Sequence, residues 1–318
     1  MLITIILLVA GFAILVKGAD WLVDGASSLA RRYRVSELVI GLTIVAFGTS
    51  APELVVNIIA SLKKYNDLTI GNIVGSNIFN LLCILGISGI IYPITVQNKT
   101  VWREIPFSLL AGLLLFFLAN DTFRHQAVNM LSRWDGVIFL LFFILFSVYI
   151  FKNLRNNQQD VKDEVKIFRL PVTIFFIIIG FAALIIGSKL VISNSIKIAH
   201  VFGVSEKLIG LTIVSAGTSL PELVTSAVAA YKRRSDIAIG NIIGSNIFNI
   251  YLILGISAVI NPISYNLSFN IDILVYIGAT LLLFLAMFSG GKRKLDRWEA
   301  AIMLGMYIIY LVYIIIRR

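Results

Sequence analysis

The sequence predicts an all-α, polytopic membrane protein with ten transmembrane helices, arranged as two five-helix repeats of inverted topology. Three observations carry this prediction. The chain of 318 residues is 58% hydrophobic and only 14% charged, against roughly 25% charged residues in a soluble domain. Apolar runs of about 20 residues, the length that crosses a bilayer, recur along the whole chain. A forty-residue segment also occurs twice.

The apolar runs divide the chain into ten predicted helices. The first and sixth are long for about 30 Å of hydrocarbon, so we expect them to tilt or to extend past the membrane. The chain is apolar from Leu2 and lacks a basic segment before the first run, which therefore reads as a span and not as a cleaved signal peptide. The helices are predicted near residues 2–29, 37–62, 68–93, 103–119, 134–151, 168–199, 206–231, 237–261, 270–288 and 297–316.

One polar linker separates the chain into two halves. Residues 152–169 read KNLRNNQQDVKDEVKIFR and are predicted to form a solvated cytosolic connector. We therefore expect a first five-helix repeat at residues 1–151 and a second one at residues 170–318. Because five is an odd number of spans, the second half must cross the membrane in the opposite direction to the first, as in many secondary transporters.

The positive residues indicate how the protein is oriented. If both termini lie outside, the inside loops hold seventeen Lys and Arg residues and the outside segments hold eight. Cytoplasmic loops carry an excess of such residues, so the sequence predicts a multi-pass protein of the plasma membrane with both termini extracytoplasmic. The net charge of +10 could also indicate nucleic-acid binding. The charges lie in short loops between spans, however, so we expect the lipid bilayer as partner, no nucleic acid and no obligate protein partner.

The repeated segment lies at residues 41–80 and again at residues 210–249. Twenty-five of the forty aligned positions are identical, at a constant offset of 169 and without a gap. Matches outside the segment pair Gly11, Phe12, Gly18 and Pro93 with Gly180, Phe181, Gly187 and Pro262, and the sequence LSRWD from Leu131 with LDRWE from Leu295 at an offset of 164.

Each copy places one glutamate, Glu53 or Glu222, about half-way along an apolar span. A charge at the centre of a membrane helix costs about 2.5–3.5 kcal/mol on insertion scales, so acids there usually face a cavity or a partner. Inversion about an axis in the membrane plane brings two such acids towards each other. The alternative interpretation is a structural carboxylate, held by hydrogen bonds between helices or simply protonated.

Each glutamate follows a predicted break in its helix. Pro52 has no N–H and its ring clashes with the carbonyl one turn back, while Gly48 weakens the same turn. We expect unpaired carbonyl groups at residues 46–48 and, ahead of Pro221, at residues 215–217, where they could bind a cation. The alternative is that Gly and Pro only kink these helices. The helix faces of the two acids also carry a threonine four residues earlier, Thr49 and Thr218.

The second part of each copy, GNIxGSNIFN, has small and polar residues at helical spacing. Glycines four residues apart, Gly71 with Gly75 and Gly240 with Gly244, allow a close approach to a neighbouring helix. A serine and an asparagine also share one helix face in each copy. Hydrogen bonding between helices, without any ligand function, is their alternative role. These pairs are Ser76 with Asn80 and Ser245 with Asn249.

The side chains singled out in this way are all oxygen donors. Such a set suits hard cations, of which Ca²⁺ takes roughly 6–8 oxygen ligands whereas Mg²⁺ dehydrates reluctantly. Soft metals favour imidazole or thiolate ligands, but His125 and His200 fall in loops or at span ends, and Cys83 is the single cysteine of the chain. Monovalent cations could also neutralise two carboxylates, and protons could compete for them.

The paired motifs G-T-S-x-P-E-L and G-N-I-x-G-S-N-I-F-N resemble the two alpha-repeats of the cation/calcium exchanger superfamily, and those of the sodium/calcium exchangers in particular. The resemblance spans essentially the whole chain. It implies a transporter without a cofactor, and not an enzyme, that exchanges Na⁺ for Ca²⁺ by alternating access, with the first and sixth helices as its moving bundle. The cation ligands that it implies are Glu53, Thr49, Ser50, Ser76, Asn80, Glu222, Thr218, Ser219, Ser245, Asn249 and the carbonyl oxygens of Ala46 and Ser215.

Two details of the motifs bear on the coupling ion. The proton-coupled branch of the superfamily typically has an asparagine-containing GNAxE-type motif, whereas both copies here read GTS, so we expect sodium coupling. Some relatives, including the potassium-dependent branch, have Asp at the position of Asn249, so the neutral amide indicates exchange without K⁺. A Ca²⁺/H⁺ antiporter that uses the same glutamates is the alternative, and a cation channel is a second one.

Overall fold

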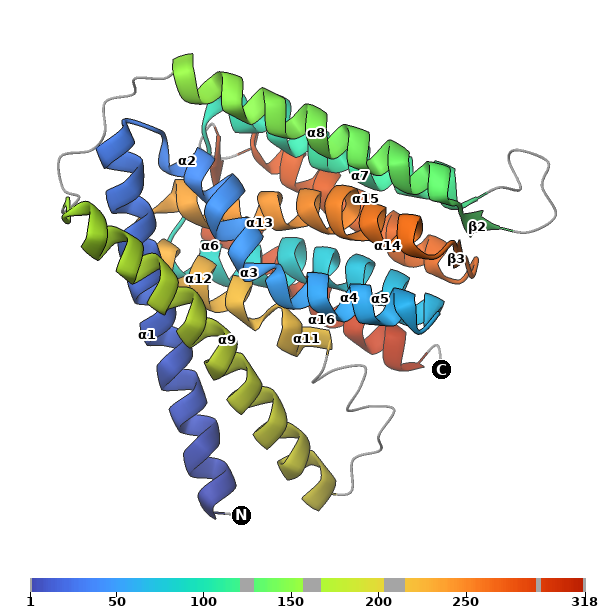
Figure 1. Ribbon diagram of the computed structural model, residues 1–318, viewed down its shortest axis with the longest axis horizontal. Coiled ribbons are helices and arrows are strands. Elements are labelled where there is room, and N and C mark those ends of the chain that lie inside the picture. The colour runs from blue at the N-terminus through green and yellow to red at the C-terminus, as the bar shows by residue number, and fades with distance from the viewer. Residues whose placement is uncertain (1, 121–128, 157–166, 203–214, 290–292, 317–318) are drawn as a thin grey trace.

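The computed structural model describes residues 2–120, 129–156, 167–202, 215–289 and 293–316, and these residues are almost entirely helical (Figure 1). The helices of the first half are α1 (Leu2–Tyr33), α2 (Glu37–Ile40), α3 (Ala46–Thr49), α4 (Ala51–Leu62), α5 (Asn66–Ile78), α6 (Leu85–Ile91), α7 (Ile105–Ala119) and α8 (Arg133–Asn156). Those of the second half are α9 (Leu170–Val201), α11 (Ser215–Thr218), α12 (Leu220–Tyr231), α13 (Ser235–Ile247), α14 (Gly255–Ile260), α15 (Phe269–Ala286) and α16 (Arg297–Ile316). Four π-helical segments lie between or before them, namely η1 (Gly41–Val45), η2 (Phe79–Ile84), η3 (Thr100–Glu104) and η6 (Phe248–Leu254). The strands are β1 (Ile94–Thr95), β2 (Met130–Leu131), β3 (Ile263–Ser264) and β4 (Lys294–Leu295).

Eight helices in the described part of the chain are long and apolar enough to cross a membrane. They correspond to all of the predicted spans except the second and the seventh. Helices Glu37–Thr49 and Ala51–Leu62 form a bent pair that would make a ninth span. The predicted span 206–231 is described only from Ser215 onward, so the count of ten helices stays a prediction.

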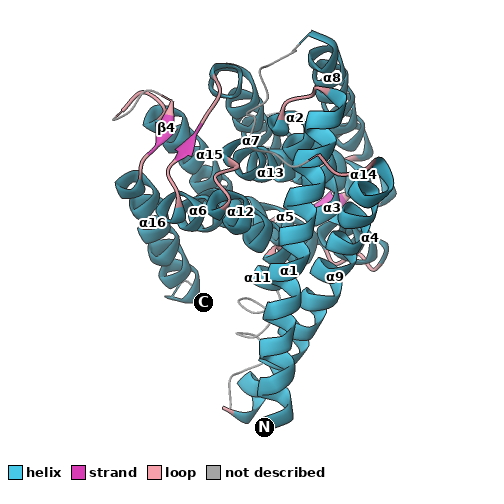
Figure 2. Ribbon diagram, turned by 90° about the vertical axis from the view of Figure 1, so that its left-hand side faces the viewer, coloured by secondary structure: helices cyan, strands magenta, loops and turns pink. Residues whose placement is uncertain are grey.

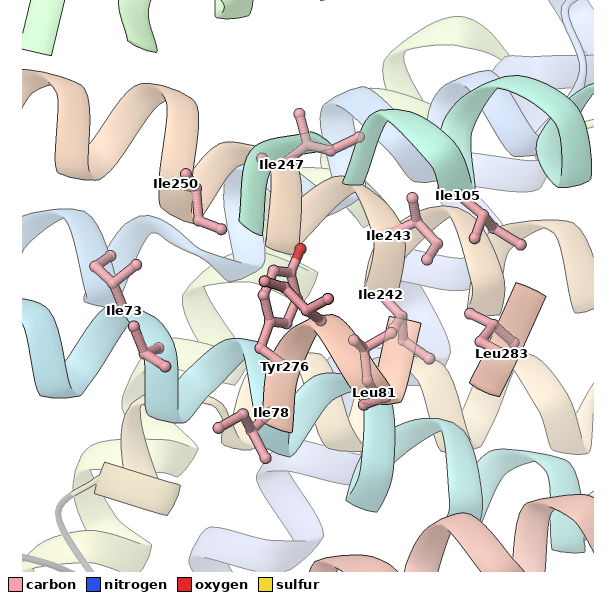
Figure 3. Packing of buried hydrophobic residues seen from close by; sticks show 14 of the residues in the cluster. Ile73, Ile78, Leu81, Ile105, Ile242, Ile243, Ile247, Ile250, Tyr276 and Leu283 are labelled. Atoms are coloured by element: carbon pink, nitrogen blue, oxygen red, sulfur yellow. The ribbon is translucent and has the colours of Figure 1, made fainter. Parts of the chain in front are cut away.

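The repeated segments form the innermost helices. In the most apolar window of Asn66–Ile91 and of Ser235–Ile260, 83% of the residues are buried, against 22% for α1 and for α16. Figure 3 shows Tyr276 of α15 among isoleucines of α5 and α13, and its hydroxyl lies 2.8 Å from Ser108 Oγ of α7. The outer helices instead carry many exposed large apolar side chains, as expected for a surface that faces lipid.

Helices α1 and α9 lie side by side and extend beyond the rest of the molecule (Figures 1 and 2). Glycines bring their backbones together, because a Cβ atom on Gly18 would lie 3.0 Å from the carbonyl oxygen of Gly180, and one on Gly187 would lie 3.0 Å from that of Gly11. The offset of 169 makes Gly11 equivalent to Gly180, and Gly18 equivalent to Gly187. Small residues at such positions are typical of closely packed membrane helices.

Replacing Gly18 with valine is expected to destabilise the α1–α9 contact by about 1–3 kcal/mol, the usual cost of overpacking. The first added carbon would lie 2.8 Å from Ala183 Cβ and 3.0–3.1 Å from backbone atoms of the same helix, α9. The thermal unfolding midpoint of the purified protein measures the effect. Gly305→Val is the matched control, since nothing lies within 4 Å of a Cβ atom on Gly305. Equal unfolding midpoints for the two variants would contradict the expectation.

Two antiparallel strand pairs connect loops that are distant in the sequence. β1 pairs with β4, with Ile94 opposite Leu295, and β2 pairs with β3, with Leu131 opposite Ile263. The offset of 169 relates Ile94 to Ile263, and the offset of 164 relates Leu131 to Leu295. Each strand pair joins one loop of the first half to one loop of the second half. The two pairs are therefore equivalent contacts in which the halves exchange places.

The segments that follow β2 and β4 also adopt matching conformations. Asp135 Oδ2 accepts a hydrogen bond of 2.8 Å from the backbone N–H of Ser132, and Glu299 Oε2 accepts one of 2.8 Å from that of Asp296. Each acid thus caps the start of its helix, α8 or α16. The resemblance between LSRWD and LDRWE reflects this shared cap.

Candidate cation site

Each glutamate lies in the first turn of a helix that follows a break in the backbone. The pair Glu37–Thr49 and Ala51–Leu62 is bent by 48° around Ser50, and Glu53 lies at the start of α4. Glu222 has the same place in α12, after Ser219. These breaks confirm the predicted interruption of both helices. They also place each carboxylate in the first turn of its helix, where the helix dipole favours a negative charge.

Of the carbonyl groups at residues 46–48 that we expected the break to free, the one of Ala46 is hydrogen-bonded. Ser50 N donates to the carbonyl oxygen of Ala46 at 3.0 Å, and Thr49 Oγ1 donates to the same oxygen at 3.3 Å. The prediction of an unpaired carbonyl at Ala46 is therefore wrong. The helix continues regularly as far as Thr49, and Pro52 removes only the N–H that would have bonded the carbonyl of Gly48.

The two glutamates are bonded across the repeats. Ser50 Oγ donates to Glu222 Oε1 at 2.8 Å, and Ser219 Oγ donates to Glu53 Oε1 at 2.9 Å. Both glutamates are only 1% exposed. The serine of each motif therefore contacts the acid of the other motif, and the two motifs form a single cluster.

The serines of the inner helices join this cluster. Ser76 Oγ of α5 lies 3.1 Å from Ser219 Oγ, which itself contacts Glu53. Ser245 Oγ of α13 donates to Glu222 Oε1 at 3.4 Å. The structure thus brings four of the predicted serines together around the two carboxylates.

The threonines of the motifs contact two asparagines that the sequence analysis did not single out. Thr49 Oγ1 donates to Asn241 Oδ1 at 3.0 Å, and Thr218 Oγ1 lies 3.5 Å from Asn72 Oδ1. Asn241 Nδ2 also donates to the backbone oxygen of Glu222 at 3.4 Å. Asn72 and Asn241 follow the first glycine of GNIxGSNIFN, and their identity in the two copies was the available signal.

Asn80 and Asn249 lie one helical turn beyond Ser76 and Ser245, on the same helix faces. No direct hydrogen bond joins either amide to a carboxylate in the described residues. Asn80 Nδ2 donates to Asn246 Oδ1 at 3.0 Å, and Asn249 Nδ2 donates to Asn77 Oδ1 at 2.9 Å. The amide oxygens of both Asn80 and Asn249 are buried without a hydrogen-bond partner.

The glycines of the GTS motifs contact the sixth predicted span. A Cβ atom on Gly48 would lie 2.0 Å from the ring of Phe181, and one on Gly217 would lie 2.5 Å from Ile192 Cγ1. Phe181 and Ile192 both belong to α9. Gly48 lies within a regular helix, so its role is to admit the Phe181 ring and not to weaken a turn.

The glycines of α13 confirm the predicted close approach for the second copy. A Cβ atom on Gly240 would lie 2.8 Å from the carbonyl oxygen of Leu38, and one on Gly244 would lie 2.7 Å from Ala46 Cβ. Gly71 and Gly75 have no equally close neighbour among the residues that the structure describes. The segment that would correspond to Leu38 and its neighbours lies within residues 203–214, outside the description.

The two carboxyl groups of the cluster have no positive side chain beside them in the described part of the chain. Within the described ranges, no Lys, Arg or His forms an ion pair with Glu53 or Glu222. The second carboxylate oxygen of each glutamate is buried and has no hydrogen-bond partner. Burying uncompensated carboxylates is costly. The arrangement, with free oxygens of two acids and two amides, therefore fits a bound hard cation.

Comparisons with known proteins identify relatives along the whole chain. A family model described as "Sodium/calcium exchanger protein" matches residues 3–152 and 172–316. The putative antiporter CaxA of Alkalimonas amylolytica is 38% identical over 98% of both chains. The sodium/calcium exchanger MaX1 of Methanosarcina acetivorans is 32% identical over 96% of this chain and 97% of its own. A solved structure of the sodium-calcium exchanger NCX_Mj matches with a TM-score of 0.83 at 32% identity, over 98% of both chains.

Proposed function

Because the chain belongs to the sodium/calcium exchanger protein family, we propose that it is a secondary active antiporter that exchanges Na⁺ for Ca²⁺ across the plasma membrane by alternating access. One observation carries this proposal. Two buried carboxylates, each bonded by a serine of the other repeat, keep one oxygen free and have no positive partner in the described residues.

Ca²⁺ and Na⁺ are the proposed substrates, and they compete for this cluster. One Ca²⁺ neutralises both carboxylates, whereas Na⁺ needs more than one ion to do so. An empty cluster leaves two charges uncompensated inside the membrane. The cluster therefore switches its access from one side of the membrane to the other mainly when cations occupy it. This rule couples the two ion flows. The proposed ligands are Glu53, Thr49, Ser50, Ser76, Asn80, Glu222, Thr218, Ser219, Ser245, Asn249 and the carbonyl oxygens of Ala46 and Ser215. The oxygen of Ala46 would bind the ion through the lone pair that the hydrogen bond from Ser50 N leaves available.

The proposal includes ten helices in two inverted repeats, at residues 1–151 and 170–318. The equivalent strand pairs support it, because alternate crossing puts the two loops that each pair joins on the same side of the membrane. The placement of Lys and Arg supports extracytoplasmic termini and a cytosolic linker at residues 152–169.

Helices α1 and α9 are the proposed moving bundle. They pack on each other through matched glycines, and α9 contacts the backbone of both GTS motifs at Gly48 and Gly217. A displacement of this pair would therefore change access to the cluster from either side. Lys232 after α12 bonds Asp20 and Asp24 of α1 at 2.6 and 2.7 Å, and such ion pairs would have to break for the pair to slide.

Neutral amides at Asn80 and Asn249 support exchange without K⁺, since they leave the two glutamates as the only acids of the cluster. A Ca²⁺/H⁺ antiporter is the second candidate, because protons can neutralise the same carboxylates and the relative CaxA is named only as a putative antiporter.

Uptake of ⁴⁵Ca²⁺ by proteoliposomes tests these alternatives. We expect a Na⁺ gradient to drive uptake, with no response to an equal gradient of Li⁺ or K⁺, and saturation with Ca²⁺ concentration. A response to a pH gradient with none to Na⁺ would favour the Ca²⁺/H⁺ antiporter. Flux that neither saturates nor needs a counter-ion would indicate a channel and contradict exchange.

A further inference from the structure

Four asparagines form two crossed amide pairs between the inner helices. Asn249 Nδ2 donates to Asn77 Oδ1 at 2.9 Å, and Asn80 Nδ2 donates to Asn246 Oδ1 at 3.0 Å. All four side chains are at most 1% exposed. Asn77 and Asn246 are at equivalent positions of the two copies, as are Asn80 and Asn249. The two pairs are thus one contact that occurs twice.

Each pair fixes the direction of an amide. A side-chain amide has an oxygen on one side and an NH₂ group on the other. Once the NH₂ group of Asn80 or Asn249 is held by the opposite repeat, its oxygen must point the other way. Both of these oxygens are buried and unpartnered. A buried acceptor without a donor costs free energy unless something else approaches it.

We propose that Asn77 and Asn246 are positioning residues, which turn the amide oxygens of Asn249 and Asn80 towards the transported cation. The inference rests on the proposed function and deepens it. Without the hydrogen bond to Asn77 or Asn246, the amide of Asn249 or Asn80 can rotate by 180° and present its NH₂ group, whose positive end repels Na⁺ and Ca²⁺. Asn77 and Asn246 touch no cation themselves and act only through the neighbouring amide.

The amide of Asn77, which orients Asn249, is itself held in one orientation. Asn77 Nδ2 donates to the backbone oxygen of Asn246 at 3.4 Å, so its own oxygen faces Asn249. A carboxylate at position 249 would set its oxygen against that of Asn77, two acceptors without a proton between them. The orientation of Asn77 therefore selects a neutral amide at position 249. Asn246 Nδ2 has no such partner, so Asn77 gives the sharper test.

The test compares Asn77→Ala, Asn77→Asp and the control Asn120→Ala. Asn120, which is buried, and Asn270, which is part-buried, form another amide pair between the repeats, outside the cation cluster, with bonds of 2.9 and 2.8 Å. Replacing a residue that orients a metal ligand typically costs about 10–100-fold in metal affinity. We therefore expect Asn77→Ala to raise the KM for Ca²⁺ by about tenfold or more, with a much smaller change of the rate at saturating Ca²⁺. The protonated carboxyl group that Asn77→Asp introduces keeps both an acceptor for Asn249 and a donor to the backbone oxygen of Asn246, so this variant should restore the KM to near the wild-type value.

The control separates positioning from a general loss of stability. Asn120→Ala should lower the thermal unfolding midpoint about as much as Asn77→Ala but leave the KM unchanged. An unchanged KM in Asn77→Ala, or an equal rise of the KM in Asn77→Ala and Asn77→Asp, would overturn the proposed positioning role of Asn77. The rise of the unfolding midpoint with added CaCl₂ gives a second readout that needs no transport. If wild-type vesicles show no sodium-driven uptake, the proposed function fails, and this binding readout still decides whether Asn77 orients a cation ligand.

Discussion

Replacing Glu53 or Glu222 with glutamine is expected to reduce sodium-driven Ca²⁺ uptake to about one-thirtieth of the wild-type rate or less, since losing one partner of a buried charge pair costs about 2–5 kcal/mol. Glutamine keeps the shape and the oxygen that accepts from Ser219 or Ser50, but it removes the negative charge. The remaining acid cannot compensate a divalent ion alone. Initial rates of ⁴⁵Ca²⁺ uptake, normalised to reconstituted protein, measure the effect.

Glu104→Gln is the matched control for these two variants. Glu104 is another buried acid of the membrane region, but its carboxylate accepts from Tyr149 and lies outside the cluster. Uptake by this variant should stay within about twofold of wild type, because glutamine keeps an oxygen that accepts from Tyr149 and leaves the charge of the cluster unchanged. Near-normal uptake by Glu53→Gln or Glu222→Gln would reject the assignment of that acid as a cation ligand.

Ser219→Ala and Ser50→Ala are expected to weaken Ca²⁺ binding by about tenfold each, because a hydrogen bond to a charged group contributes about 1.5–3 kcal/mol. The crossed geometry adds a sharper expectation. Ser219 bonds Glu53 and not the acid of its own motif, so Ser219→Ala should couple strongly to Glu53→Asp and weakly to Glu222→Asp. Equilibrium ⁴⁵Ca²⁺ binding to the single and double variants gives the two coupling energies.

Residues in contact typically show coupling of about 0.5–3 kcal/mol in such cycles. The equivalent cycles with Ser50 should show the opposite preference, for Glu222. Equal coupling of Ser219 to both acids would mean that the serine acts through the bound ion, and would contradict a role for the direct hydrogen bond. If the effects of the serine and glutamate substitutions on Ca²⁺ binding were additive in every cycle, neither serine would act on cation binding together with a glutamate.

Much of the site could be predicted because the two copies carry the same residues at the same helical spacing. The helix breaks before Glu53 and Glu222 followed from Pro52 and Pro221, whose chemistry acts within one turn of the same helix. The close helix approach through the glycines of α13 followed from their spacing. These features depend on local sequence alone, and the repeat doubles each signal.

Contacts between helices could not be predicted in the same way. Spacing from Ser76 gives the helix face of Asn80, which lies in η2, but not that Asn246 of α13 would hold its amide. The carbonyl of Ala46 was expected to be unpaired, yet Ser50 N reaches it because the helix bends only after Thr49. Gly48 was read as a weak point of its helix, whereas the ring of Phe181 occupies the space beside it. Each of these outcomes depends on the relative position of two helices.

The crossed serine–glutamate bonds have a consequence for the ancestry of the chain. Each acid takes its hydroxyl partner from the opposite half. With the proposed inverted repeats, a shorter gene that encoded one half alone could build this cluster only from two copies of its product, inserted into the membrane in opposite directions. A fusion of the two copies would fix their ratio at one to one, and each copy would then need to insert in one direction only. Differences between the copies, such as Ala46 against Ser215, could then accumulate on one side only.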